Sequence, residues 1–392
     1  MFKNALRVTL ALFAGLALGL VLLETSLHLN PRLLLRGMAV PAPVYTPVQE
    51  QIYDVHYSDG DIFFWQPELV QPIPLTEDRL EGTVHFQTDE FGFPNQAPLP
   101  PQVDIIVLGR SHSLGAQASQ PWTHQLMKSS GLSLLNLSQT GAGTSLKRDY
   151  LKKFGLPRQP RWAVVGILPA LDIIGYSPNP NWLVPNLAYP VIQHIYRRFN
   201  NGSPKQAIAK PIYPLQIDIP GQTVELTFYT NYLSTLTIEP SEMRDSQQWA
   251  SASQELVDLI QLARKNKVCV ILLYVPTKPD IYFPLAEDAS QLELVLDTLA
   301  PWRLDSTHTL VQDPSFTTSI RQMQSNAGAA RGLLIEFARQ QGVLLADPSQ
   351  ALTQAALQGD APYMLYDTHW SVTGHRIVAQ TILEIIQNAS CP

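Results

Sequence analysis

Three polar segments of this sequence carry residue types that can perform acyl chemistry together. They read GRSHS around Ser111, NLSQTGAG around Gly141, and DTHWSVTGH with Asp367 and His369 near the C-terminus. A serine hydroxyl becomes a nucleophile when a base lies within hydrogen-bond reach and an acid orients that base. Asp367 and His369 are two positions apart, so their side chains fall on the same side of an extended loop. A tight turn at Gly141 can aim a backbone N–H at a developing oxyanion, so the set predicts acyl transfer through a covalent serine ester.

Short apolar runs that end near these segments are predicted to be buried strands. The five runs span residues 103–109, 132–138, 161–168, 267–275 and 342–348. Predicted helices alternate with them at 119–130, 144–154, 245–265, 326–340 and 372–387. This alternation predicts an α/β fold, a three-layer α/β/α sandwich around a parallel five-stranded sheet. Catalytic and binding sites in open sheets form at the carboxyl ends of the strands, so the polar segments are expected to meet there.

The N-terminus predicts a membrane anchor. Residues 8–23 carry no charge and follow Lys3 and Arg7, so a single transmembrane helix near 7–29 with a cytoplasmic N-terminus is expected. A cleaved signal peptide and a buried core helix are the alternatives. The predicted domains are 1–30 as the cytoplasmic N-terminus and anchor, 31–102 as a stalk and strands packing on the main domain, and 103–392 as the α/β domain. Within that domain, 176–240 is expected to be a β-rich insertion, with a β-like run at 224–238.

Composition excludes several classes of protein. Apolar residues make up 45% of the chain, which is enough for a sizeable core and excludes wholesale disorder. The net charge of −6 and the lack of a basic block in the folded part disfavour a nucleic-acid binder. Of the two cysteines, Cys269 falls in a predicted buried strand and Cys391 near the C-terminus, so no disulfide framework is expected. The nine histidines are scattered, so neither a metal nor another cofactor is expected.

The chain resembles the SGNH (GDSL-type) hydrolase family over about residues 103–175 and 265–388. VLGRSHSLG is similar to the family's first block, NLSQTGAG to its second and DTHWSVTGH to its last. The resemblance implies Ser111 as nucleophile, His369 as base and Asp367 as its partner. It also implies an oxyanion hole from the backbone N–H groups of Ser111 and Gly141. The D-x-H-W order, FGFPN and PTKPDIY resemble membrane-anchored bacterial members related to polysaccharide O-acetyltransferases.

Two positions depart from the family pattern. Arg110 stands in place of the aspartate of G-D-S, and Leu171 in place of the oxyanion-hole asparagine of the third block, G-x-N-D. A leucine side chain donates no hydrogen bond, and losing one oxyanion donor raises the activation barrier by about 3–4 kcal/mol. The alternatives for completing the hole are Asn179, Asn181, the Arg110 guanidinium, or the two backbone N–H groups alone. Asp172 is either the remnant of the third block or a cap for the next segment.

Several other side chains near these blocks have expected roles. Arg110, His112, Asn179 and Asn181 are the candidates for contact with substrate. His375 is expected to pack in the first turn of the last helix, and Lys278 to lie at a solvated strand end.

The resemblance implies an extracytoplasmic serine esterase or O-acyltransferase, attached to the cytoplasmic membrane by one span. Its substrate would be an acyl ester, chiefly an acetyl ester, of an envelope or exported polysaccharide. The alternative is a catalytically degenerate SGNH domain that binds glycan or serves as a scaffold. A cleaved and secreted lipase-like hydrolase is a third hypothesis.

Overall fold

The structure of this chain is a computed structural model, in which residues 45–178 and 207–392 group together. The described residues are 15, 19, 50–58, 61–64, 80–89, 91–115, 118, 120–139, 142–174, 211–299, 301–313, 315–364 and 368–389. Of the predicted membrane span, only Gly15 and Gly19 are described, and both are helical. No helix within the described ranges is both long and apolar enough to cross a bilayer.

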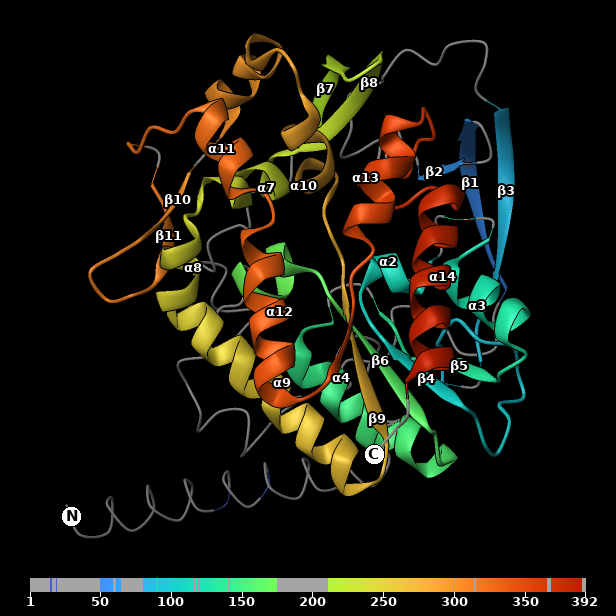
Figure 1. Cartoon of the computed structure of the whole chain (residues 1–392). Coiled ribbons are helices and arrows are strands. Elements are labelled where there is room, and N and C mark those ends of the chain that lie inside the picture. Colours follow the sequence, from blue (N-terminus) through green and yellow to red (C-terminus); the bar gives the residue numbers. More distant parts are fainter. Residues whose placement is uncertain are drawn as a thin grey trace, which may run out of the picture. The chain divides into compact units, whose positions relative to one another are not determined.

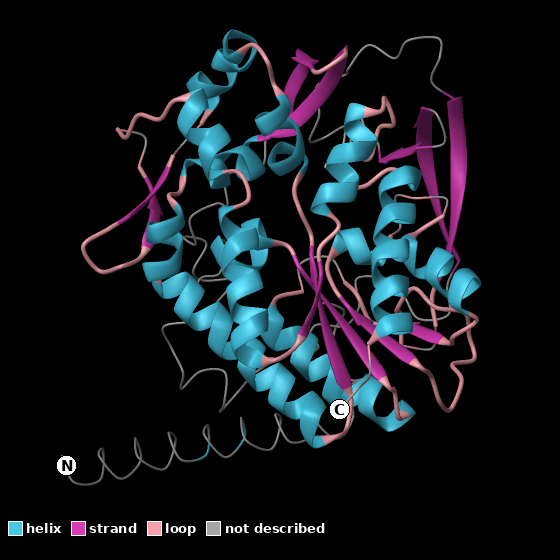
Figure 2. Ribbon diagram, in the orientation of Figure 1, coloured by secondary structure: helices cyan, strands magenta, loops and turns pink. Residues whose placement is uncertain are grey.

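A parallel five-stranded sheet forms the centre of the unit, as the sequence predicts (Figure 2). Its strands are β4 (Ile105–Leu108), β5 (Leu134–Asn136), β6 (Trp162–Ile167), β9 (Cys269–Tyr274) and β12 (Leu344–Ala346). The strand order is β12-β9-β6-β4-β5, and every neighbouring pair is parallel. This is the doubly wound 2-1-3-4-5 order, in which the chain reverses direction across the sheet at β4. Ligands of such sheets bind at that switch point, beyond the carboxyl ends of the strands.

Six helices account for most of the helical layers. They are α3 (Trp122–Ser130), α4 (Thr144–Tyr150), α9 (Gln247–Lys265), α12 (Ala329–Gln341), α13 (Ser349–Leu357) and α14 (Val372–Asn388). Five of them confirm predicted helices to within a few residues at each end, whereas α13 is not predicted. The two longest begin at serine caps: the Ser246 hydroxyl accepts from Trp249 N, and the Ser371 hydroxyl from Gly374 N. The last predicted turn of α4 is instead the π-helical η2 (Leu151–Gly155) and the 3₁₀ turn η3 (Leu156–Arg158).

Alternation along the strands divides the core into two layers, because successive side chains point to opposite faces of a sheet. One face, which includes Ile105 and Ile271, packs against α3, α13 and α14. The opposite face, which includes Ile106 and Leu272, packs against α4, α9 and α12. Figure 1 shows the two groups of helices on either side of the strands. The predicted α/β/α sandwich is therefore confirmed.

Smaller elements complete the described part of the chain. Three antiparallel strands form a separate sheet in the order β2-β1-β3: β1 (Glu50–Ser58), β2 (Asp61–Phe64) and β3 (Leu80–Gln87). Two hairpins are β7 (Pro211–Ile219) with β8 (Gln222–Tyr229), and β10 (Trp302–Leu304) with β11 (Leu310–Gln312). The remaining helical pieces are α2 (Ser111–Leu114), η4 (Ala170–Ile174), α7 (Thr230–Leu233), η5 (Ser234–Thr237), α8 (Pro240–Asp245), α10 (Lys278–Tyr282), η6 (Phe283–Leu285), η7 (Ala289–Thr298) and α11 (Ile320–Asn326).

The insertion is β-rich only in part. Residues 211–229 form the hairpin, but the expectation of a β-like run continuing to 238 is wrong, because 230–237 is helical. The short helices bury Leu233 and Leu236 in the same core as the sheet. Tertiary burial of these leucines outweighs the β-propensity of the surrounding threonines and tyrosines.

Cys269 corrects another expectation, because it is disulfide-bonded. It begins β9, the strand after the long helix α9. The chain's only other cysteine, Cys391, lies outside the described residues.

Candidate active site

Ser111 lies where the sequence places it, directly beyond the carboxyl end of β4. The chain leaves the strand at Gly109 and turns into the short helix α2, with Arg110 at its N-cap. A Cβ atom at position 109 would lie 2.4 Å from Ser113 Oγ, so only glycine permits so tight a turn. Ser111 is half-buried and therefore reachable from solvent.

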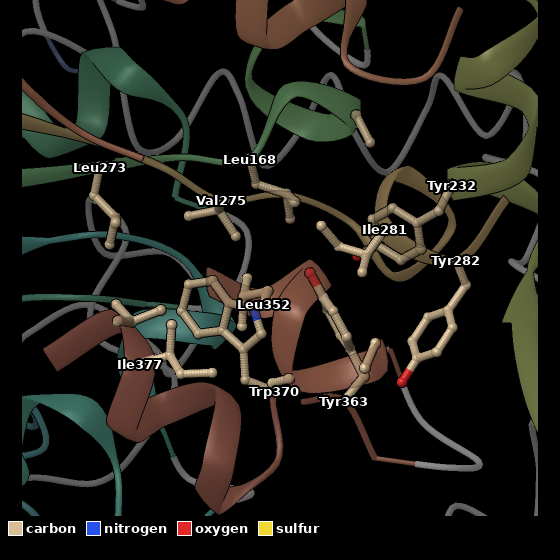
Figure 3. Close-up of a cluster of buried hydrophobic side chains, with 14 of the residues drawn as sticks. Leu168, Tyr232, Leu273, Val275, Ile281, Tyr282, Leu352, Tyr363, Trp370 and Ile377 are labelled. Atoms are coloured by element: carbon tan, nitrogen blue, oxygen red, sulfur yellow. The ribbon is translucent and has the colours of Figure 1, made fainter. Parts of the chain in front are cut away.

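His369 lies in a loop that joins α13 to α14. An isolated β-bridge between Tyr363 and Trp370 closes this loop, and Met364 N donates to the His369 carbonyl at 3.0 Å. Figure 3 shows Trp370 and Tyr363 inside the apolar cluster with Leu352 and Ile377, where both rings are fully buried. His369 itself is half-buried, so its imidazole is accessible although the neighbouring side chains of the loop are buried. Asp367 lies outside the described residues.

His112 brings the Ser111 turn and the His369 loop together. Its ring centroid lies 4.6 Å from that of His369 and 5.1 Å from that of Trp370. Its Nε2 lies 3.3 Å from the Thr368 carbonyl oxygen, 256 positions away in the sequence. Since a carbonyl only accepts, Nε2 of His112 carries the hydrogen. The predicted nucleophile and base therefore belong to segments in direct contact. His112 is only 2% exposed, so its ring faces the loop and is closed off from solvent.

The third block forms a buried ion cluster. Asp172, in η4 beyond β6, accepts through Oδ1 from Arg110 Nε at 3.0 Å and from Lys147 Nζ at 2.9 Å, and through Oδ2 from Leu168 N at 2.8 Å. Arg110 Nη2 also donates to the Leu171 carbonyl at 2.9 Å. The Arg110 guanidinium is thus directed to Asp172 and to the backbone of the block that lacks the family asparagine.

Burial shifts the proton equilibria of this cluster. It lowers the pKa of Lys147 to about 8, and the Asp172 carboxylate acts in the opposite direction. Burial alone would raise the pKa of Asp172, but the charges of Arg110 and Lys147 outweigh it and hold that pKa below its ordinary value. Lys147 is not predicted from the sequence as part of the site. Its signal is its position on the buried face of α4 with Thr144 and Tyr150, one turn apart from each.

The second block is fixed by amide side chains. Asn136 at the end of β5 donates through Nδ2 to the Ser113 carbonyl at 2.8 Å, which joins β5 to α2. Asn95 of the FGFPN segment accepts from Asn136 N at 2.8 Å and donates to its carbonyl at 3.0 Å. Gln139 accepts a hydrogen bond from the Tyr150 hydroxyl. Gly141 lies outside the described residues.

Lys278 holds the other side of the His369 loop. Its ammonium donates to the Thr227 carbonyl at 3.0 Å and to the Met364 carbonyl at 2.5 Å. The expectation of a solvated strand end is wrong, because the residue is 1% exposed. The Tyr363 hydroxyl adds a bond to the Pro276 carbonyl at 2.8 Å, so the loop is attached to the segment that follows β9.

His375 packs in the first turn of α14, as predicted, and stays neutral. Trp122 N donates to its Nδ1 at 3.2 Å, and its side chain is buried. Burial, assisted by repulsion from His369, lowers the pKa of His375 to about 3.

The structure places the predicted site residues unevenly. It places His112, the residue after Ser111, against His369, and it directs Arg110 to Asp172. Asn179 and Asn181 lie outside the described residues, as do Asp367 and Gly141. Within the described part of the chain, no three His, Cys, Asp or Glu residues are grouped as metal ligands would be.

Asp172→Asn tests the ion cluster. The change keeps the side-chain volume but leaves two buried cations without a counter-charge, so we expect a loss of about 3–5 kcal/mol in the free energy of unfolding. Urea denaturation measures this loss. The matched control is Glu336→Gln, which removes the exposed ion pair with Arg244 (3.6 Å) and should cost about 0–1 kcal/mol. Equal losses in the two variants would contradict the assignment.

His375→Asn tests the neutral histidine. The amide oxygen of the asparagine can accept a hydrogen bond from Trp122 N, but the asparagine side chain does not titrate. The wild-type pKa is lower in the folded than in the unfolded state, so stability is complete above pH 6.5 and falls as the pH approaches 3. Relative to the variant, the wild type should lose up to about 1.4 kcal/mol for each pH unit in this window. Thermal unfolding between pH 8 and 4 checks it, and parallel profiles would refute the account.

No family model matches this chain, and no curated protein matches it. Solved structures with a similar arrangement include a putative acylhydrolase from Bacteroides fragilis. The match has 13% identity, covers 74% of this chain and 91% of the acylhydrolase, and has a TM-score of 0.36. A GDSL-like lipase from Bacteroides thetaiotaomicron has 13% identity, 75% and 94% coverage and a TM-score of 0.36. A lipase/acylhydrolase from Enterococcus faecalis has 14% identity, 74% and 98% coverage and a TM-score of 0.33. Likeness at this level assigns neither a family nor an activity to the chain.

Proposed function

We propose that this protein is a serine esterase or O-acyltransferase of the SGNH type. It acts outside the cytoplasmic membrane on acyl esters, chiefly acetyl esters, of an envelope or exported polysaccharide. The observation that carries the proposal is the contact between the Ser111 turn and the His369 loop through His112. The nature of the substrate rests on the sequence blocks and on the predicted anchor.

The proposed reaction begins when His369 removes the proton of the Ser111 hydroxyl as its oxygen attacks the ester carbonyl. The oxyanion of the tetrahedral intermediate accepts hydrogen bonds from backbone N–H groups at Ser111 and Gly141. The intermediate collapses, His369 gives its proton to the leaving alcohol, and an acyl-Ser111 ester remains. Water or a sugar hydroxyl then attacks this ester, which releases the acid or the acylated sugar and restores Ser111. Asp367 orients His369 in this scheme.

The disulfide at Cys269 supports a location outside the cytoplasm. Disulfides persist in oxidising compartments and are rare where thiol reductants are abundant. The predicted span has Lys3 and Arg7 on the cytoplasmic side. This orientation also places the α/β domain outside the cytoplasm.

Leu171 favours one alternative, a catalytically inactive domain that binds glycan or serves as a scaffold. Its side chain is apolar, and its backbone carbonyl accepts a hydrogen bond from Arg110.

The net charge of the ion cluster around Asp172 favours catalytic activity instead. Two cations and one carboxylate leave a positive charge beside the Ser111 turn, reduced by the nearby Glu255, which would stabilise an oxyanion.

Ser111→Ala decides between these functions. The full-length wild type in detergent should hydrolyse p-nitrophenyl acetate, and the variant should lose at least about 10³-fold in kcat because no acyl-enzyme can form. p-Nitrophenyl palmitate serves as a second substrate, since a lipase-like enzyme would prefer the long chain. Adding a sugar oligomer separates transfer from hydrolysis, because a transferase yields acetylated sugar.

Thermal unfolding of Ser111→Ala is the control for folding. If neither acetyl nor longer esters show Ser111-dependent turnover, the enzyme proposal fails. Binding of an acetylated polysaccharide by that inactive protein would then establish the alternative.

A further inference from the structure

The side chain of His112 connects the two halves of the proposed catalytic pair. It belongs to the residue directly after Ser111, yet it contacts three consecutive residues of the distant loop. Its ring packs on His369 at 4.6 Å and, edge to face, on Trp370 at 5.1 Å, and its Nε2 donates to the Thr368 carbonyl at 3.3 Å. Any shift of the His369 loop relative to the Ser111 turn must therefore disturb this side chain.

We propose that His112 is a positioning residue that holds His369 toward Ser111, through its hydrogen bond to Thr368 and its packing on the His369 ring. This inference rests on the proposed function. Proton transfer requires the base within about 3 Å of the hydroxyl, and a misplacement of about 1 Å can cost 10²-fold in rate. A side chain that is 2% exposed offers little surface to a substrate, so its contribution is to geometry.

The rest of the loop has its own attachments, so loss of His112 should not unfold it. Lys278 donates to the Met364 carbonyl, the Tyr363 hydroxyl donates to the Pro276 carbonyl, and Ser371 N donates to the Pro362 carbonyl at 3.1 Å. These contacts hold residues 361–364 and the start of α14, and Met364 N in turn donates to the His369 carbonyl. His112 adds the contacts to the Thr368 carbonyl and to the His369 ring. Removing His112 is expected to displace the His369 ring while the core stays folded.

Two substitutions separate the hydrogen bond from the ring. His112→Gln keeps an amide donor near the position of Nε2, and His112→Phe keeps an aromatic ring but has no donor. We expect kcat for p-nitrophenyl acetate to fall at least 10-fold in His112→Phe, with KM within about 3-fold of the wild type. The kcat of His112→Gln should be at least 3-fold higher than that of His112→Phe. The matched control is His124→Phe on the exposed side of α3, which should retain wild-type kcat.

The melting temperature of each variant separates positioning from folding. If His112→Phe does not fold, His112→Asn replaces it with the same expected loss, because its shorter amide cannot reach the Thr368 carbonyl. Wild-type kcat in a folded variant without the donor overturns the proposal. Equal kcat losses in His112→Gln and His112→Phe that parallel their losses in melting temperature also overturn the proposal.

The wild type and Ser111→Ala are measured alongside. Ser111-dependent turnover with no effect at His112 refutes the positioning role alone and leaves the esterase standing. Absence of Ser111-dependent turnover refutes the proposed function, and the positioning role falls with it.

Discussion

The buried carboxylate of Asp172 is the constraint on which the site's architecture depends. A carboxylate removed from water is stable only when paired and hydrogen-bonded, and Asp172 is 1% exposed. Its partners come from three separate stretches: Arg110 from the turn after β4, Lys147 from α4, and Leu168 N from the end of β6. Satisfying one charge therefore fixes the relative positions of the turn that carries Ser111 and the segment that follows β6.

The His369 side of the site follows a different principle. Its loop is anchored by apolar burial of Trp370 and Tyr363, and its carbonyl groups are bonded by buried side chains, Lys278 and His112. Ionic compensation thus positions the turn that carries the proposed nucleophile, and packing positions the loop that carries the proposed base. His112 is where the two arrangements meet. The proposed reactive residues, Ser111 and His369, are only half-buried, so both remain accessible above a buried interior.

The sequence predicts the sheet and its layers well, because strands buried on both faces read as continuous apolar runs and amphipathic helices alternate with them. It also predicts which segments converge, since Ser111 and His369 follow apolar elements. It does not predict Lys147 and Lys278, because a lysine on a helix is ordinarily solvated and only the fold supplies the carboxylate or carbonyls that compensate burial. The helical form of residues 230–237 and the contact of His112 with Thr368 are not predicted for a similar reason. The core that buries Leu233 and Leu236, and the Thr368 carbonyl, become neighbours of these residues only in three dimensions.

The central claim is that Ser111 is a nucleophile activated by His369. The most direct measurement is the rate and site of labelling by a fluorophosphonate, whose phosphorus the serine oxygen attacks with release of fluoride, read by peptide mass spectrometry. The account predicts one adduct, on Ser111, that forms at least about 10²-fold more slowly in His369→Ala. An adduct on another residue, or equal labelling of Ser111 with and without His369, would contradict it.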